Sequence, residues 1–259
     1  MPMLICSGVN RPDLLALLAE ERVAGMVNAA EVCQPRLWQA CLQHPDVPLF
    51  LDSGAFQGKM ELATYQAIIE RVGQRFTWVA NLDVIGDQRR SNEHYDALME
   101  ALPCSLRGKI LWVYQGGDVR ELAERAHEHK FVGLGGIVRL LAQQGTERAL
   151  TYLMILGEIL LDAGAQAHIF GLGSPYLLGR LGSAPWFRSF DTSKWLLAYK
   201  AGAVLLENGE RRSAAQLGLR LNSGECACNN IRQLHMWANP RAESKLMLSL
   251  WEDSDTIDF

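Results

Sequence analysis

The chain has 259 residues, of which 49% are hydrophobic and 21% are charged, and this composition is typical of a globular protein. Its formal net charge is −4, so no overall basic field attracts nucleic acid, and any such binding needs a local basic face. The most hydrophobic stretch, residues 150–164, carries two acidic side chains and is too short to span a bilayer. The start of the chain lacks a signal-peptide pattern. We therefore expect a cytoplasmic protein with no membrane partner.

Short apolar runs alternate with helical patterns over residues 1–202. The runs that read as strands are residues 4–6, 23–28, 47–51, 77–82, 110–114, 131–134, 168–170 and 186–190. The helices predicted between them include one capped by Asn10, then 36–42, 61–75, one capped by Ser91, 118–130, 146–163, one starting at Pro175, and 194–200. Such alternation predicts an α/β fold with a parallel sheet. Eight repeats favour a (β/α)8 TIM-type barrel over the rival, a doubly wound open sheet.

The pattern changes after residue 202. Asn208-Gly209 lies between two strand-like pairs and predicts a hairpin with a two-residue turn. A further strand at residues 216–221 and helices at 229–237 and 242–251 are also expected. Residues 203–259 would thus form a C-terminal appendage packed on a catalytic barrel domain of residues 1–202.

Polar and glycine residues follow the predicted strands at their carboxyl ends, and they are Asp52, Asp83, Gln115, Gly135-Gly136, Gly173 and Asp191. In a (β/α)8 barrel these ends meet at one face, where such enzymes build their active sites. Two carboxylates presented there can divide the chemistry, one as nucleophile and one as general acid or base. Each also has a structural interpretation, because aspartates commonly cap turns and helices and glycine pairs make turns.

Six segments occur in one order along the chain: LDSGAFQG at 51–58, NLDVIGD at 81–87, VYQGG at 113–117, VGLGGI at 132–137, FGLGSP at 170–175 and SFDTSKW at 189–195. Together they resemble the tRNA-guanine transglycosylase superfamily, and DVIGD and DTSKW look most like its DNA-modifying branch. The resemblance implies a barrel that cuts an N-glycosidic bond and exchanges guanine in DNA for a 7-deazaguanine base such as preQ0 or a derivative. A helper protein that opens the duplex is an open question.

The resemblance also implies roles for individual residues. Asp191 would be the nucleophile that forms a covalent aspartyl-sugar intermediate, and Asp52 would handle the proton of the leaving and entering bases. Asp83 would accept hydrogen bonds from guanine N1 and its amino group. The remaining base-binding residues would be Gln115, Gly135, Gly136, Phe56 and Gly173. Because a base inside a duplex cannot enter such a pocket, the substrate would be single-stranded or flipped out.

Two further predictions concern contacts with the nucleic-acid backbone and a metal site. Lys194, Arg188 and Arg211 are expected to contact phosphates, with Trp186 and Trp195 interleaved for stacking. Ordinary solvated charge is the alternative interpretation. The family's zinc motif is half present: Cys226 and Cys228 fit, but Ile231 stands at the third position, and His235 is a candidate replacement ligand for a structural zinc.

Three alternatives stay open at this stage. The substrate polymer is tRNA in the first, and the chain is a non-catalytic nucleic-acid-binding barrel in the second. The third is an unrelated barrel lyase or aldolase, which would need a Schiff-base lysine or a metal cluster at the strand ends. The departures within the motifs also matter: Ala55 replaces a glycine, and Ile137-Val138-Arg139 brings no acidic residue after the glycine pair.

Overall fold

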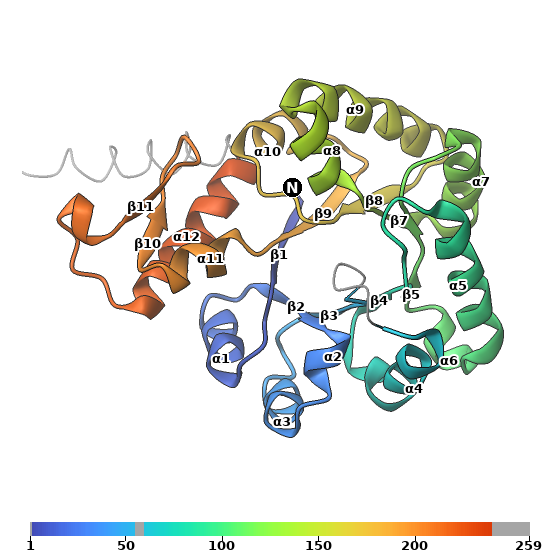
Figure 1. Ribbon diagram of the computed structural model, residues 1–259, viewed down its shortest axis with the longest axis horizontal. Helices are drawn as coiled ribbons and strands as arrows, with labels where there is room; N and C mark the ends of the chain where they lie inside the picture. The colour runs from blue at the N-terminus through green and yellow to red at the C-terminus, as the bar shows by residue number, and fades with distance from the viewer. Residues whose placement is uncertain (1, 55–59, 240–259) are drawn as a thin grey trace, which may run out of the picture.

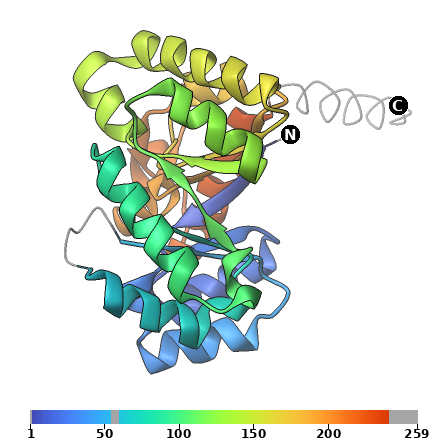
Figure 2. The same cartoon turned by 90° about the vertical axis from the view of Figure 1, so that its right-hand side faces the viewer.

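The fold is a ring of parallel strands covered by helices, as seen in a computed structural model that describes residues 2–54 and 60–239 (Figures 1 and 2). The strands of the main sheet are β1 (Met3–Ser7), β2 (Ala24–Asn28), β3 (Leu49–Asp52), β4 (Trp78–Ala80), β5 (Ile110–Leu111), β6 (Val113–Tyr114), β7 (Phe131–Leu134), β8 (Gln166–Ile169) and β9 (Phe187–Thr192). Each is a short apolar run, as expected for parallel strands that are covered on both faces.

The strand order shows how the ring closes. It runs β5-β4-β3-β2-β1-β9-β8-β7-β6, and every pairing is parallel. The two terminal strands of that order, β5 and β6, are consecutive in sequence and separated only by Trp112, whose carbonyl accepts the Gly133 N–H at 2.7 Å. They occupy one position, so nine strand segments make eight positions in a barrel-like ring. The predicted (β/α)8 TIM-type architecture is confirmed, and the open doubly wound sheet is excluded.

Helices surround the ring on its outside (Figure 1). They are α1 (Pro12–Glu20), α2 (Ala29–Val32), α3 (Pro35–Gln43), α4 (Leu62–Val72), α5 (Gln88–Ala101), α6 (Cys104–Arg107), α7 (Val119–His129), α8 (Ile137–Gln144), α9 (Thr146–Asp162), α10 (Pro175–Leu181), α11 (Lys194–Lys200) and α12 (Ser223–Ala238), with 3₁₀ turns at Gly73–Arg75 and Ala215–Leu217. None of the helices described is long and apolar enough to cross a membrane.

Several predicted helix starts are confirmed and two are wrong. Asp118 caps α7, and Ser174 caps α10 just before Pro175. The predicted cap Asn10 is wrong, because Arg11 precedes α1 and its side chain makes no capping hydrogen bond. Ser91 is wrong as well: α5 begins one turn earlier, where Asp87 accepts the N–H of Arg90. A carboxylate placed earlier satisfies the free N–H groups first.

The hydrophobic core has two layers. The larger layer lies between strands and helices. A smaller one fills the interior of the ring and is formed by Ile5, Ala24, Met26, Phe50, Trp78, Ala80, Leu111 and Val113, with Phe131 and Phe170 against it. A filled interior forces any ligand to approach at a rim of the barrel rather than through its centre.

Residues 203–239 form a hairpin and a long helix that pack beside α10 and α11 (Figure 1). The strands β10 (Ala203–Leu205) and β11 (Arg211–Ser213) pair antiparallel, which confirms the hairpin. Its loop has three residues rather than two, because the Leu206 N–H bonds to the Glu210 carbonyl, with Gly209 at φ +85°. The predicted strand at 216–221 is wrong: this stretch holds a 3₁₀ turn followed by Gly218 at φ +70°. The helix predicted at 242–251 lies outside the described residues.

Gly157 in α9 allows the packing between this helix and the strands to be tested. A Cβ on Gly157 would lie 2.3 Å from the indole of buried Trp186. We expect Gly157→Ala to destabilise the protein by about 1–3 kcal/mol, because overpacking outweighs the gain in helix propensity. Gly179→Ala in α10 is the matched control, since its Cβ would meet nothing within 4 Å. Urea unfolding of both variants measures the difference, and equal behaviour would contradict this account of the packing.

Candidate active site

Three aspartates lie where β3, β4 and β9 end at the same rim of the barrel. Asp52 is the last residue of β3, Asp83 follows β4 by three residues, and Asp191 lies near the end of β9. Asp191 pairs in register with Ile5, a residue of the interior core, so its side chain faces into the ring. It is 6% exposed, whereas Asp52 and Asp83 keep partial solvent access.

The Asp191 carboxylate is held by two donors on one oxygen. Its Oδ1 accepts the Gly171 N–H at 2.8 Å and lies 3.3 Å from His168 Nε2. In the described part of the chain both hydrogen bonds reach Oδ1, so Oδ2 is the oxygen left for chemistry. The structural alternative, Asp191 as cap of the next helix, is not what the structure has, because Ser193 occupies that position.

The pKa of the Asp52 carboxyl is shifted toward neutral pH. Burial, together with the negative charges of Asp83 and Asp191, raises its pKa from 3.8 to about 7, although the N–H groups of Gly54 and Ser53 oppose the shift. Like charges that share a small volume disfavour ionisation of one partner. At neutral pH this carboxyl therefore exists in both protonation states, as general acid and base catalysis needs.

Asp83 is oriented by two neighbours. Its Oδ1 accepts the Ser53 hydroxyl at 2.8 Å, and its Oδ2 accepts a hydrogen bond from the Gln115 amide. Burial raises the pKa of Asp83, and these hydrogen bonds counter part of the shift. Asp87, and not Asp83, caps helix α5. Asp83 therefore stays at the rim, where the hydrogen bonds from Ser53 and Gln115 fix the orientation of its carboxylate.

The predicted glycines allow close approach of other groups. A Cβ on Gly135 would lie 2.2 Å from Gln115 Nε2, so only glycine lets this amide lie against the strand end. Gly136 adopts φ +72° just before α8, whose start has no side-chain cap. A Cβ on Gly173 would lie 2.6 Å from Thr192 Oγ1 and 2.9 Å from the Lys194 stem. All three glycines thus lie at the rim that carries the aspartates.

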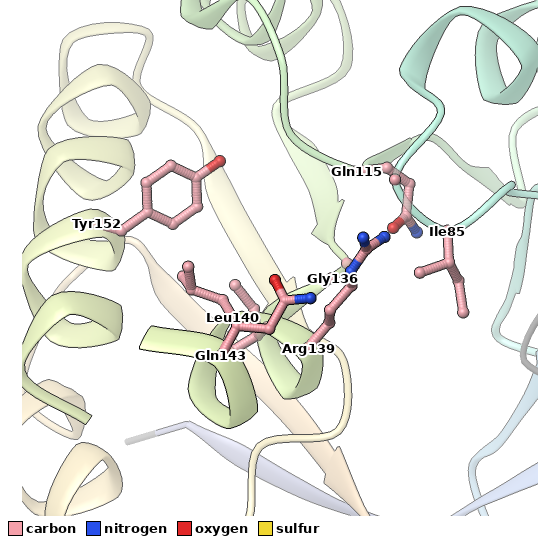
Figure 3. A pocket seen from close by; sticks show the side chains of 10 residues that line it. Ile85, Gln115, Gly136, Arg139, Leu140, Gln143 and Tyr152 are labelled. Carbon is pink, nitrogen blue, oxygen red and sulfur yellow. The ribbon is translucent and has the colours of Figure 1, made fainter. Parts of the chain in front are cut away.

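A cavity of about 200 Å³ opens beside Gln115 (Figure 3). Its lining comes from the segment after β4, the ends of β6 and β7, and helices α8 and α9, and consists of Ile85, Gly86, Gln115, Gly135, Gly136, Ile137, Arg139, Leu140, Gln143 and Tyr152. Gln115 is 8% exposed, and its Oε1 has no hydrogen-bond partner among residues 2–54 and 60–239. The Gln115 carbonyl oxygen is therefore a buried acceptor that a ligand in the cavity could satisfy by donating a hydrogen bond.

The predicted phosphate contacts are only partly gathered at this rim. Lys194 is half-buried beside Gly173, and burial lowers its pKa. Arg188 is the extra residue of a β-bulge near the start of β9, at the end of the strand away from Asp191. Arg211 is exposed on the appendage hairpin. The expected stacking residues Trp186 and Trp195 are 3% and 0% exposed, so both belong to the core and neither can stack on a base.

The predicted zinc ligands are not assembled. Cys226 and Cys228 lie two residues apart within α12, where successive side chains rotate by about 100° and these two point to different sides. Cys226 is buried against Val204 and Ala214, while Cys228 hydrogen-bonds with Glu21 on another element. Within residues 2–54 and 60–239 no group of three His, Cys, Asp or Glu side chains could hold a metal. The residues, His235 included, do not fit a structural zinc.

His168 is the functional residue that the sequence analysis did not identify. It is fully buried in the ring, with its ring 4.9 Å from Trp78 and 4.4 Å from Phe170. Burial lowers its pKa, so the imidazole is neutral; with Nε2–H donated to Asp191, Nδ1 accepts the Ser189 hydroxyl at 3.0 Å. A polar residue inside an apolar strand run was the available signal.

The remaining predicted site residue, Phe56, lies outside the described residues. In comparisons with known proteins, no family model matches this chain and no curated protein sequence is significantly similar to it.

Proposed function

We propose that this protein is a transglycosylase that exchanges guanine in DNA for a 7-deazaguanine base. The observation that carries the proposal is the pairing of two unlike carboxyls at one rim. Asp191 is fixed by His168 and Gly171, while the pKa of Asp52 is raised to about 7 by burial and by Asp83 and Asp191. Such a pair supplies a nucleophile and a proton carrier. The ordered strand-end segments that resemble DNA-modifying transglycosylases add support.

The proposed chemistry has two displacements. Asp191 Oδ2 attacks the sugar C1′, an ester bond forms, the bond from C1′ to guanine N9 breaks, and the departing nitrogen takes the proton of Asp52. The incoming base then loses its N9 proton to Asp52 and attacks C1′, which releases the Asp191 carboxylate. Protons and electron pairs balance over the cycle, and configuration at C1′ is retained.

Base recognition falls to Asp83 and Gln115 in this proposal. Asp83 accepts from guanine N1 and the amino group, a pattern that adenine cannot supply. In the free protein, Ser53 and Gln115 already hold this carboxylate in place. A target base must leave its stack to arrive there, so single-stranded DNA is the better substrate.

The decisive experiment incubates the protein with radiolabelled 7-deazaguanine and single-stranded DNA, duplex DNA or tRNA, and then separates free label from polymer. We expect label in DNA and a protein–DNA adduct that survives denaturation. Label in tRNA alone would replace DNA by tRNA as the substrate. Polymer binding without label transfer or adduct would favour a non-catalytic binding protein.

His168 gives a prediction that belongs to this mechanism. His168→Phe keeps the ring that packs against Trp78 but removes the Nε2–H bond to Asp191. We expect the rate of adduct formation to fall about 10- to 100-fold, because the nucleophile is less well oriented. DNA binding should be unchanged. His127→Phe, on the exposed face of α7, is the control; equal rates in both variants would remove His168 from the mechanism.

A further inference from the structure

The cavity beside Gln115 is polar on one side and carries a single type of charge. Among the described residues that line it, only Arg139, in the first turn of α8, carries a charge. Figure 3 shows the Arg139 side chain extending from α8 toward the Gln115 amide, and both residues line the cavity. In the described chain Arg139 forms no ion pair, and no carboxylate lines the space. The uncapped start of α8, at Gly136, adds further positive potential.

The second feature of this cavity is the carbonyl oxygen of Gln115, a hydrogen-bond acceptor to which no described residue donates. Gln115 donates through its Nε2 to Asp83, and this bond directs the other amide atom, Oε1, away from Asp83. Oε1 is buried and finds no hydrogen-bond partner in the part of the chain that the structure describes, although Arg139 lines the same space. A buried carbonyl without a donor is costly, and a ligand that donates here recovers the cost. A ligand that fits this cavity would therefore donate a hydrogen bond to Gln115 Oε1 and accept one from the Arg139 guanidinium.

We propose that this cavity holds the substituent on the incoming base and selects an uncharged group that both donates and accepts hydrogen bonds, with Arg139 as the residue that excludes cations. The inference rests on the proposed function, because Gln115 serves the base and also lines the cavity. In a 7-deazaguanine, the substituent at C7 lies on the same edge as the O6 carbonyl. A group attached there continues past Gln115 into the cavity.

The chemistry ranks three substituents. A carboxamide donates to Gln115 Oε1 and accepts from Arg139, so it satisfies both groups. A nitrile accepts from Arg139 but leaves Oε1 without a donor. An aminomethyl group is an ammonium ion at neutral pH, and it meets the Arg139 charge with no carboxylate among the described lining residues to offset it. Arg139 is exposed, so solvent and salt screen part of this repulsion, and one such like-charge contact is still expected to cost about tenfold or more in KM.

The test compares four bases in the exchange assay: 7-deazaguanine without a substituent and its carboxamide, cyano and aminomethyl derivatives. For the wild-type protein we expect the lowest KM with the carboxamide and at least a tenfold higher KM with the aminomethyl base. Arg139→Gln should abolish the discrimination against the cation, and Arg139→Glu should reverse it. Arg148→Glu, on the exposed face of α9 and outside the cavity, is the charge-matched control and should change nothing.

The outcomes separate the two proposals. Exchange of the unsubstituted base with equal KM for carboxamide and aminomethyl derivatives would overturn the cavity assignment and leave the proposed function standing. If no base is exchanged, the proposed function fails, and calorimetric titration of the free bases still tests the cavity. There, tighter binding of the carboxamide than of the aminomethyl base, reversed in Arg139→Glu, supports the assignment. Equal affinities, or an unaltered ranking in Arg139→Glu, would overturn it.

Discussion

Replacement of Asp191 by asparagine is expected to abolish the covalent adduct and to lower base exchange by at least about a thousandfold. An amide has no carboxylate electron pair for attack on C1′, so the first displacement cannot occur. The shape of the side chain is unchanged, and its oxygen still accepts from Gly171 and His168, so the fold should be preserved. Denaturing gels of labelled DNA after incubation with the protein measure the adduct directly.

The control for this experiment is Asp162→Asn, an exposed residue at the end of α9. It should form the adduct at the wild-type rate. Binding of single-stranded DNA should be similar in the wild type and both variants, because neither change alters a predicted phosphate contact. An adduct that persists in Asp191→Asn would assign the nucleophile to another residue and defeat the mechanism.

Replacement of Asp52 by asparagine is expected to stabilise the folded protein, and increasingly so as pH rises. In the folded state the pKa of Asp52 is about 7, against 3.8 for an unperturbed aspartate. Between about pH 4 and pH 7 the unfolded chain has released this proton while the folded chain retains it. Folded protein binds more protons, so the stability contributed by this group falls as pH rises through that window and is constant above it.

The expected size follows from the shift. Three pKa units correspond to about 4 kcal/mol at most, and partial solvent access at Asp52 reduces this to roughly 1–3 kcal/mol. Asp52→Asn should therefore exceed the wild-type free energy of unfolding by that amount near pH 8 and match it near pH 4, while losing base exchange. Urea unfolding at several pH values measures the difference, with exposed Asp46→Asn as control. A gain that is independent of pH would refute the assigned proton affinity.

Much of the barrel could be predicted from the sequence, because each parallel strand is a short apolar run bounded by polar residues or glycine. The run at residues 110–114 appears in the structure as β5 and β6, and it closes the ring at Trp112. Helix starts were less predictable. Ser91 and Asp87 are both good caps, and which one acts depends on where the chain leaves β4. The helix α8 is eight residues long and begins directly after the glycine pair Gly135-Gly136, and the sequence analysis does not predict it.

The candidate site divides in the same way. That Asp52, Asp83 and Asp191 stand at strand ends follows from sequence position alone, since strand ends of a parallel barrel share one rim. Their proton affinities and partners do not follow, because these depend on distances between residues far apart in the chain. Two examples are the hydrogen bond between His168 and Asp191 and the Gln115 carbonyl oxygen, which receives no hydrogen bond from the described residues.

The sequence by itself determined the alternation of strands and helices and the acidic strand ends, because periodicity and local polarity are properties of neighbouring residues. Only the tertiary structure decided that Trp186 and Trp195 are core residues, that Cys226 and Cys228 face different sides of one helix, and that Arg139 lines a cavity with Gln115. The physical reason is that burial and electrostatic coupling are set by which segments pack together, and linear spacing does not contain that information.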